Sequence, residues 1–286
     1  MSLIDQLSLF PPETVRVADG ASVQFRRAHG TGVASGASVT HVLLHGIGSA
    51  SGSWLAQLQQ ARVARLGANH VLAWDAPGYG ASSALPMPVP QALDYAARLW
   101  AWLDAVRVTQ PFTLVGHSLG ALMAAAAAVQ APTRVARLVL LAPAQGYARA
   151  SADVRDTKLA DRLANLAALG PAGVARTRAA AMVSAQADEA QRLFVEQVMA
   201  QIDPAGYTQA ACMLAGGDLL GDLLQLSCPV VIANGESDTV TPPQAARALA
   251  RETGATYLSL GAVGHSCALQ AGLQVNRLLG LQEDAA

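Results

Sequence analysis

The sequence predicts an α/β fold in which helices cover both faces of a mostly parallel sheet. Short apolar runs alternate with segments of helical spacing, and each run stops at glycine, proline or a small polar residue. Most of the runs are apolar throughout, which is typical of strands that are buried on both faces. Ligands of such sheets bind at the carboxyl ends of the strands, so the residues that follow each run are the candidates for chemistry.

The expected strands follow one another in a regular order. Residues 14 to 28 alternate like two antiparallel edge strands, with Asp19 and Gly20 at the turn. The buried strands are then expected at "THVLLHG", "HVLAWDAPG", "FTLVGHS", "VARLVLLAP", "PVVIANGESD" and "ATYLSL". The longest apolar stretch, "LGALMAAAAAVQA", is shorter than the roughly 20 residues that span a bilayer, so a buried helix is expected there.

One interval breaks this alternation. Between "LLAPAQG" and "LSCPVVIANG" the sequence has helical spacing, with Leu159, Leu163 and Leu166 on one face. Asp203 and Pro204 have the pattern of an N-cap followed by proline at the first helical position. We therefore expect residues 146–224 to form a helical cap inserted into a core domain made of residues 1–145 and 225–286.

Composition excludes several classes of function. The chain of 286 residues has a net charge of −1, and its basic residues are scattered, which argues against nucleic acid as a partner. Three widely spaced cysteines predict reduced thiols rather than a zinc site or disulfides. Asp5 stands where a secretory signal would carry positive charge, so a cytoplasmic protein without a membrane partner is expected. The oligomeric state stays open.

Ser118 stands between two glycines at the end of a predicted strand. In "LVGHSLGALMAAAAAVQ" the apolar run ends just before the serine, and an alanine-rich helix follows it. Gly116 and Gly120 lack the side chains that would collide where strand and helix pack, so Ser118 is expected to project from a sharp turn. A serine that only caps a helix would leave both glycines unexplained. The pattern favours a nucleophile.

A serine hydroxyl needs a base at neutral pH, and the base needs a partner that fixes its tautomer. His265 follows the last predicted strand and is expected to open the final helix, while Asp238 follows the run "PVVIAN". Separately, Asp238 fits a helix cap and His265 an ordinary histidine at a helix start. Together, in the chain order Ser118, Asp238 and His265, they fit a catalytic triad.

Two backbone amides are expected to form an oxyanion hole. Leu119 follows the serine at a helix amino terminus, where N–H groups are unpaired. The glycine-rich segment "HVLLHGIGSASGSW" supplies a second donor, the N–H of Ile47 after Gly46. His41 and His45 nearby have i, i+4 spacing, but on a strand, so no metal is expected.

The predicted cap should supply the walls of a substrate cavity. Its apolar side chains either contact substrate or pack the cap against itself: Met182, Phe194, Met199 and Met213. Arg176 and Arg178 either bind a substrate carboxylate or lie on a solvated helix face. Gly46 and His117 are expected beside the serine, where His117 either orders the cavity wall or the first loop, or only fills space under it.

Five segments, in this order, resemble motifs of the α/β-hydrolase superfamily: "LLHGIGSASGSW", "WDAPGYGASS", "LVGHSLG", "PVVIANGESDTVTP" and "GHSCALQ". The resemblance implies an eight-stranded sheet under a helical lid, with Ser118 as nucleophile, Asp238 as acid and His265 as base. It also implies hydrolysis of a small ester or lactone without a cofactor. The chain looks most like the small bacterial enzymes typified by 3-oxoadipate enol-lactonase and the meta-cleavage-product hydrolases.

Other reactions of the same fold remain as alternatives. Carbon–carbon hydrolases usually have tryptophan where this chain has Ser266, and often asparagine where it has His117, so ester or lactone hydrolysis is favoured over carbon–carbon cleavage. Dehalogenases and epoxide hydrolases of this fold use an aspartate nucleophile, so Ser118 argues against both. An amidase, a receptor for a small ligand, and a lipase with an exposed apolar lid are the further candidates.

Overall fold

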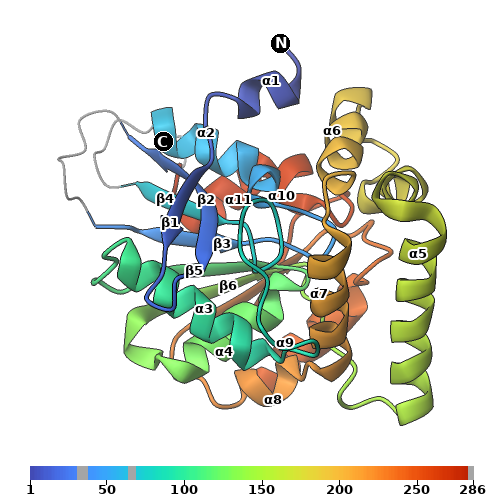
Figure 1. Cartoon of the computed structure of the whole chain (residues 1–286). Helices are drawn as coiled ribbons and strands as arrows, with labels where there is room; N and C mark the ends of the chain where they lie inside the picture. The colour runs from blue at the N-terminus through green and yellow to red at the C-terminus, as the bar shows by residue number, and fades with distance from the viewer. Residues whose placement is uncertain (31–37, 64–68, 283–286) are drawn as a thin grey trace.

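A mixed sheet of eight strands forms the centre of the protein in the computed structural model, which describes residues 1–30, 38–63 and 69–282 (Figure 1). The strand order is β1-β2-β4-β3-β5-β6-β7-β8. The strands are β1 (Glu13–Arg16), β2 (Ser22–His29), β3 (His41–Leu44), β4 (His70–Trp74), β5 (Phe112–His117), β6 (Val135–Leu141), β7 (Val230–Asn234) and β8 (Thr256–Ser259). Every strand expected from the sequence is present.

The sheet is parallel except at one edge. β1 pairs with β2 and β2 with β4 in antiparallel fashion, while the strands from β4 to β8 pair in parallel. The turn between β1 and β2 contains Gly20, whose φ is +84°. The parallel strands β3, β4 and β5 are almost wholly buried, which explains their continuous apolar runs.

Helices pack on both faces of the sheet. One core contains side chains of α3 (Ala92–Ala105), α4 (Gly120–Gln130), α8 (Leu219–Leu223) and α9 (Pro243–Thr253). A second core contains side chains of α1 (Leu3–Leu7), α2 (Leu55–Val63), α10 (Cys267–Gln270) and α11 (Gly272–Leu279). The chain between β6 and β7 adds α5 (Ala152–Met182), α6 (Glu189–Met199) and α7 (Pro204–Gly216).

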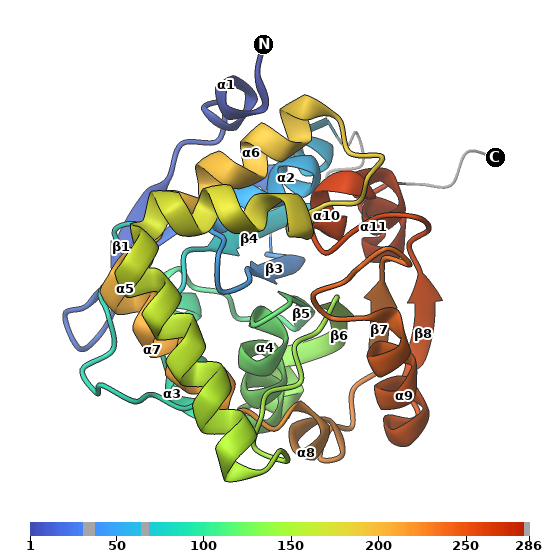
Figure 2. The ribbon, with the colours of Figure 1, turned by 90° about the vertical axis from the view of Figure 1, so that its right-hand side faces the viewer.

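Helix α5 has two arms. Gly170, with φ +62° and ψ 174°, interrupts the helix, and Pro171 begins the second arm. Figure 2 shows the bend, with the two arms of α5 running across the side of the molecule that also carries α6 and α7. Asp203 caps α7 as expected, accepting hydrogen bonds from the N–H groups of Ala205 and Gly206. The division of the chain into a core and a cap at residues 146 and 224 stays a prediction.

The end of the chain differs from the expectation of one final helix opened by His265. The structure has two short helices, α10 and α11, and His265 lies two residues before the first of them. Ala271 leaves the helical conformation between them, with φ −108° and ψ 34°. Gly272 then lies against α2, where an added Cβ would come within 2.8 Å of the Ala56 Cβ. The missing side chain at Gly272 leaves room for this close approach of α2.

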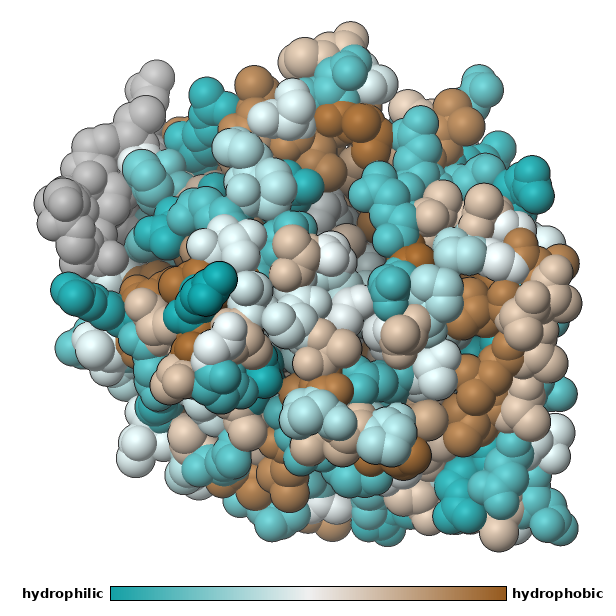
Figure 3. Space-filling view, in the orientation of Figure 1, coloured by the Kyte–Doolittle hydropathy of each residue, from teal (hydrophilic) through white to brown (hydrophobic). Residues whose placement is uncertain are grey.

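Polar and apolar residues are interspersed over the face shown in Figure 3. Among the residues that the structure describes, no helix is long and apolar enough to cross a membrane. The three cysteines are free thiols; Cys212 and Cys267 are buried and Cys228 is half-buried.

Backbone packs directly on backbone where α4 meets β3 and β5. A Cβ at Gly116 would lie 2.5 Å from the carbonyl oxygen of Gly120, and a Cβ at Gly120 would lie 2.3 Å from that of Leu44. Distances this short leave no room for any side chain. The two glycines that flank Ser118 are therefore required by packing.

We predict that Gly120→Ala destabilises the fold by about 3 kcal/mol, the upper part of the range for overpacking, because backbone atoms of β3 cannot move away. Gly254→Ala is the matched control: Gly254 has φ +71° but open space around its Cβ position, so only about 1 kcal/mol of backbone strain is expected. Urea unfolding followed by circular dichroism measures both. Equal decreases in the free energy of unfolding for the two variants would contradict the close approach of α4 to β3.

Candidate active site

Ser118 occupies a strained turn between β5 and α4. Its φ is +52°, a conformation that costs a residue with a side chain about 1–2 kcal/mol. Hydrogen bonds hold the turn: the Ser118 N–H donates to the Leu141 carbonyl at 2.9 Å, and its own carbonyl accepts from the Ala121 and Ala144 N–H groups at 3.1 Å each. The turn therefore presents the serine side chain beyond the end of β5.

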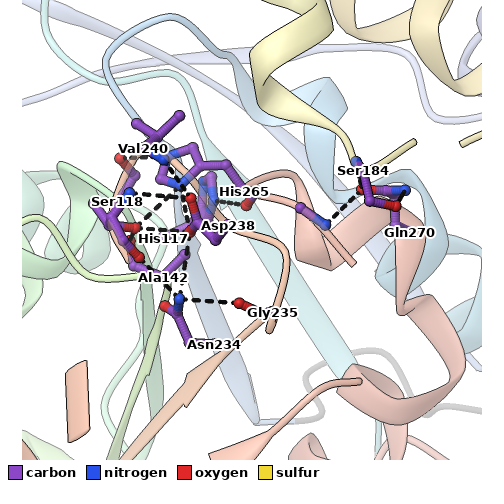
Figure 4. Close-up of polar contacts among 12 residues, drawn as sticks. His117, Ser118, Ala142, Ser184, Asn234, Gly235, Asp238, Val240, His265 and Gln270 are labelled. Carbon is purple, nitrogen blue, oxygen red and sulfur yellow. Dashed lines mark hydrogen bonds and ion pairs between the residues drawn. The ribbon is translucent and has the colours of Figure 1, made fainter. Parts of the chain in front are cut away.

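His265 lies within hydrogen-bond distance of both other residues of the predicted triad, Ser118 and Asp238 (Figure 4). The Oγ of Ser118 is 2.9 Å from Nε2 of His265. Nδ1 of His265 is 2.9 Å from Oδ2 of Asp238. All three side chains are buried, and they come from loops after β5, β7 and β8. The parallel strands thus bring together residues that are far apart in the sequence.

Asp238 is held as a carboxylate. Burial alone raises the pKa of its carboxyl group, but hydrogen bonds and the charge of His265 oppose this and leave the pKa lowered overall. Its oxygens accept from the Thr241 hydroxyl at 2.8 Å and from the backbone N–H groups of Val240 and Thr241 at 2.8 and 3.0 Å. A carboxylate only accepts, so the proton of His265 resides on Nδ1 and Nε2 faces the serine as an acceptor.

The two amides predicted for the oxyanion hole lie in the wall of the same cavity as Ser118. Within the described part of the chain, neither the Ile47 N–H nor the Leu119 N–H has a hydrogen-bond acceptor. Gly46 lines the cavity as predicted, and a Cβ there would come within 3.0 Å of the Ser118 Cβ. Unpaired donors beside a serine hydroxyl are what an oxyanion would need.

A network that sequence analysis missed holds the loop with Ile47. The Tyr79 hydroxyl donates to the Ile47 carbonyl at 2.5 Å. Asp75 accepts from the backbone N–H and the hydroxyl of Ser51 at 2.7 and 2.9 Å, and His45 accepts from the Ala76 N–H at 3.0 Å. The segment "WDAPGYG" could have indicated this network, since it contains both Asp75 and Tyr79.

His117 supports the loop that carries His265. Its Nε2 donates to the His265 carbonyl at 2.8 Å, which places its proton on that nitrogen. Burial, followed by repulsion from His265, lowers the pKa of His117 to about 3, so the ring is neutral at ordinary pH. His117 thus positions the loop as well as filling space in the cavity wall.

The cavity measures about 330 Å³, at the lower end of small-molecule sites. Of the predicted apolar wall residues, three line it: Met182, Phe194 and Met199. Met213 does not: it is fully buried in the core that contains α3 and α4, on another side of α7 from the cavity-lining Tyr207, so packing is the alternative that the structure favours for it. Helical periodicity alone does not say which face of α7 meets the cavity.

The two arginines singled out in the sequence, Arg176 and Arg178, lie in different environments. Arg178 is half-buried and lines the cavity, whereas Arg176 is exposed and does not. A third, Arg162, also lines the cavity and donates to the Tyr207 hydroxyl at 3.3 Å. Sequence analysis missed Arg162 because it lies in the other arm of α5.

The end of α5 is hydrogen-bonded to the loop of His265. The Ser266 N–H donates to the Met182 carbonyl at 2.6 Å. Gln270 accepts from the Ser184 N–H at 2.9 Å and donates to its hydroxyl at 3.0 Å (Figure 4). The end of α5, which walls the cavity, is therefore fixed to the loop that carries His265. Among the described residues no cluster of histidine, cysteine or acidic side chains has the arrangement of a metal site.

Comparison with known proteins agrees with the fold. Residues 42–278 match the profile of the Alpha/beta hydrolase family, and the chain belongs to that family. No curated protein sequence matches the chain closely enough to count as a relative.

Several solved structures share its fold. A thermophilic esterase from Thermogutta terrifontis, solved with malate bound, has a TM-score of 0.79 at 20% identity, covering 94% of this chain and 97% of its own. The enol-lactonase from Burkholderia xenovorans LB400 has a TM-score of 0.79 at 19% identity, with coverage of 94% and 98%. An esterase from Exiguobacterium antarcticum has a TM-score of 0.78 at 17% identity, with coverage of 94% and 98%.

We predict that His117→Gln flattens the pH dependence of stability in acid. The folded pKa of His117, about 3, lies below the unfolded value of about 6.5. As pH falls, the unfolded chain therefore takes up a proton that the folded chain does not. The contribution of His117 to the free energy of unfolding is complete above pH 6.5 and is lost as pH falls toward 3. The slope is about 1.4 kcal/mol per pH unit for one proton.

Urea unfolding of both proteins between pH 4 and 8 measures the change. Glutamine keeps an amide that can donate to the His265 carbonyl, so the variant should still fold. A slope as steep as that of the wild type would show that His117 does not supply this proton.

Proposed function

We propose that the protein is a serine hydrolase that cleaves a small carboxylic ester or lactone through an acyl-enzyme on Ser118. The observation that carries the proposal is the chain of two 2.9 Å hydrogen bonds from Ser118 through His265 to Asp238, beside two unpaired amides in one cavity. The esterase and lactonase names of the structural neighbours support this class of reaction.

In the first half of the reaction, Oγ of Ser118 forms a bond to the substrate carbonyl carbon while its proton passes to Nε2 of His265. The charge that develops on the carbonyl oxygen is held by the N–H groups of Ile47 and Leu119, and each such donor is worth roughly 3 kcal/mol of barrier. Asp238 stabilises the protonated imidazole. His265 then gives the proton to the leaving oxygen as the carbon–oxygen bond breaks.

In the second half, water replaces the leaving group. It transfers a proton to His265, its oxygen bonds to the acyl carbon, and the Ser118 ester breaks with return of that proton to Oγ. The products are an acid and an alcohol, or a single hydroxy acid from a lactone. No metal or organic cofactor takes part in this scheme.

The surface of α5 does not favour a lipase. On its first arm the exposed large apolar side chains are Val154 and Leu169, and the charged residues Asp156, Lys158 and Asp161 lie between them. An apolar lid for a lipid surface would present a continuous apolar face. A small soluble ester or lactone fits the cavity better.

We predict that Ser118→Ala lowers kcat on p-nitrophenyl acetate and butyrate by at least about 10³-fold, because the variant cannot form the acyl-enzyme. A fluorophosphonate probe followed by intact mass measurement should label the wild type once and the variant not at all. Ser53→Ala is the matched control, since Ser53 lines the cavity but its hydroxyl donates to the Ala50 carbonyl. It should still be labelled.

Extending the assay to lactones and amides separates esterase from lactonase and amidase activity. Equal turnover by wild type and Ser118→Ala would refute the proposal. If neither protein turns over any ester, lactone or amide and the probe fails to label the wild type, a binding protein for a small ligand becomes the better account.

We also predict that Tyr79→Phe lowers kcat about tenfold with little change in KM, because the Ile47 amide loses the hydrogen bond that positions its loop. Tyr95→Phe is the control: within the described structure its buried hydroxyl has no hydrogen-bond partner. Steady-state kinetics on p-nitrophenyl butyrate compares the two. Equal effects of the two substitutions would show that the Tyr79 hydroxyl does not position the oxyanion hole.

A further inference from the structure

Backbone groups on both sides of His265 are held by residues from outside its loop. The Gly264 N–H donates to the side-chain oxygen of Gln270 at 2.9 Å, and the Ser266 N–H donates to the Met182 carbonyl at 2.6 Å. Gln270 is the last residue of α10, while Met182 is the last residue of α5. The position of the imidazole therefore depends on groups that are not members of the triad.

The side chain of Gln270 joins the loop of His265 to the chain just after α5. Its Oε1 accepts from the Gly264 N–H and from the Ser184 N–H, at 2.9 Å each, and its Nε2 donates to the Ser184 hydroxyl at 3.0 Å (Figure 4). An amide oxygen has two lone pairs, so these two N–H groups use its full capacity. One oxygen atom thus holds together two segments that are far apart in the sequence.

The neighbours of this amide fix its orientation. Gly264 and Ser184 both present backbone N–H groups, which only donate, so the atom that faces them must be the oxygen of Gln270. The amide nitrogen then faces the Ser184 hydroxyl, which accepts from it and donates to the Gln186 side chain at 3.1 Å. Donors and acceptors therefore match with a single orientation of Gln270.

Gly264 also packs directly against the backbone that follows α5. A Cβ at Gly264 would lie 2.6 Å from both the Ser184 nitrogen and the Val183 carbonyl carbon. No side chain fits in this space, so the two backbones are in contact as well as joined through Gln270. His265, the next residue, begins at a point that this contact fixes.

Small shifts of the loop would disturb His265. Its two ring nitrogens lie 2.9 Å from Oγ of Ser118 and 2.9 Å from Oδ2 of Asp238. A displacement of about 1 Å in such a geometry can lower a rate by roughly 100-fold. Within the described part of the chain, Gln270 itself does not line the cavity, although Leu269 before it does.

From these contacts we propose that Gln270 is a positioning residue for His265, which it holds in place through the Gly264 N–H while fixing the loop to the chain after α5. Its effect on catalysis rests on the proposed function. Because both halves of the proposed reaction use His265, loss of the Gln270 amide lowers kcat. KM changes little, because the side chains of the cavity wall stay in place.

Gln270→Met tests this role, because methionine has a similar length but offers only a weak acceptor. We expect kcat on p-nitrophenyl butyrate to fall by about 10- to 100-fold, with KM within about twofold of the wild type. Labelling by the fluorophosphonate probe should slow by a similar factor, since it also requires His265. Gln270→Glu keeps oxygens for both N–H groups, so its kcat should lie within about threefold of the wild type.

Gln209→Met is the matched control for a loss of hydrogen bonds that does not reach His265. Gln209, in α7, accepts from the Leu85 N–H at 3.1 Å and donates to the carbonyls of Leu85 and Met87 at 2.8 and 2.7 Å. Like Gln270, it joins distant segments by three hydrogen bonds and is not among the described lining residues of the cavity. Its kcat should stay within about threefold of the wild type. Equal losses of kcat in the two methionine variants would overturn the proposal.

Proton NMR separates failure of this inference from failure of the proposed function. The Nδ1–H of His265, bonded to Asp238, should give a slowly exchanging resonance in the wild type, assigned by its absence in His265→Gln. Gln270→Met should broaden or remove this resonance, whereas Gln270→Glu and Gln209→Met should keep it. That result supports the positioning role even if the wild type turns over no ester. A resonance that is unchanged in Gln270→Met, or absent from the wild type, would refute the role even where Ser118-dependent hydrolysis is found.

Discussion

The close contact between α4 and the ends of β3 and β5 is the constraint on which the site depends. Backbone meets backbone there, so Gly116 and Gly120 admit no side chain. The chain must turn sharply between them, and Ser118 takes a positive φ that its hydrogen bonds to neighbouring strands maintain. Among the described residues, the same turn leaves the Leu119 N–H without an acceptor just before α4. The proposed nucleophile and one proposed oxyanion donor thus arise from one packing requirement.

Around this turn, polar side chains serve mainly to fix other groups. Thr241 and the N–H groups after Asp238 hold the carboxylate, His117 holds the carbonyl of His265, and Tyr79 holds that of Ile47. Each contact joins loops that follow different strands of the sheet. The fold therefore orients the groups that we propose to react, which would lower the reorganisation that the proposed reaction requires.

Much of the fold and the turn at Ser118 could be predicted from the sequence, because the patterns that determine them are local. The continuous apolar runs gave the parallel strands, and the spacing of Gly116, Ser118 and Gly120 predicted the turn. The cavity wall was harder, because it depends on which face of each helix between β6 and β7 turns inward. The sequence could not decide whether Met213 lines the wall or packs, and Arg162 was missed because its position follows from the bend at Gly170. Single glycines in helices carry no such information by themselves.

The hydrogen bonds between the end of α5 and the loop of His265 limit how the sequence of such a protein can change in evolution. Met182 and Ser184 bond to Ser266 and Gln270, so the segment that walls the cavity also steadies the loop of the proposed base, His265. Replacing the whole segment between β6 and β7 with another sequence would remove these bonds unless the new sequence restores them. Diversification of substrate range is therefore least constrained in the first arm of α5, and most constrained in its last turn.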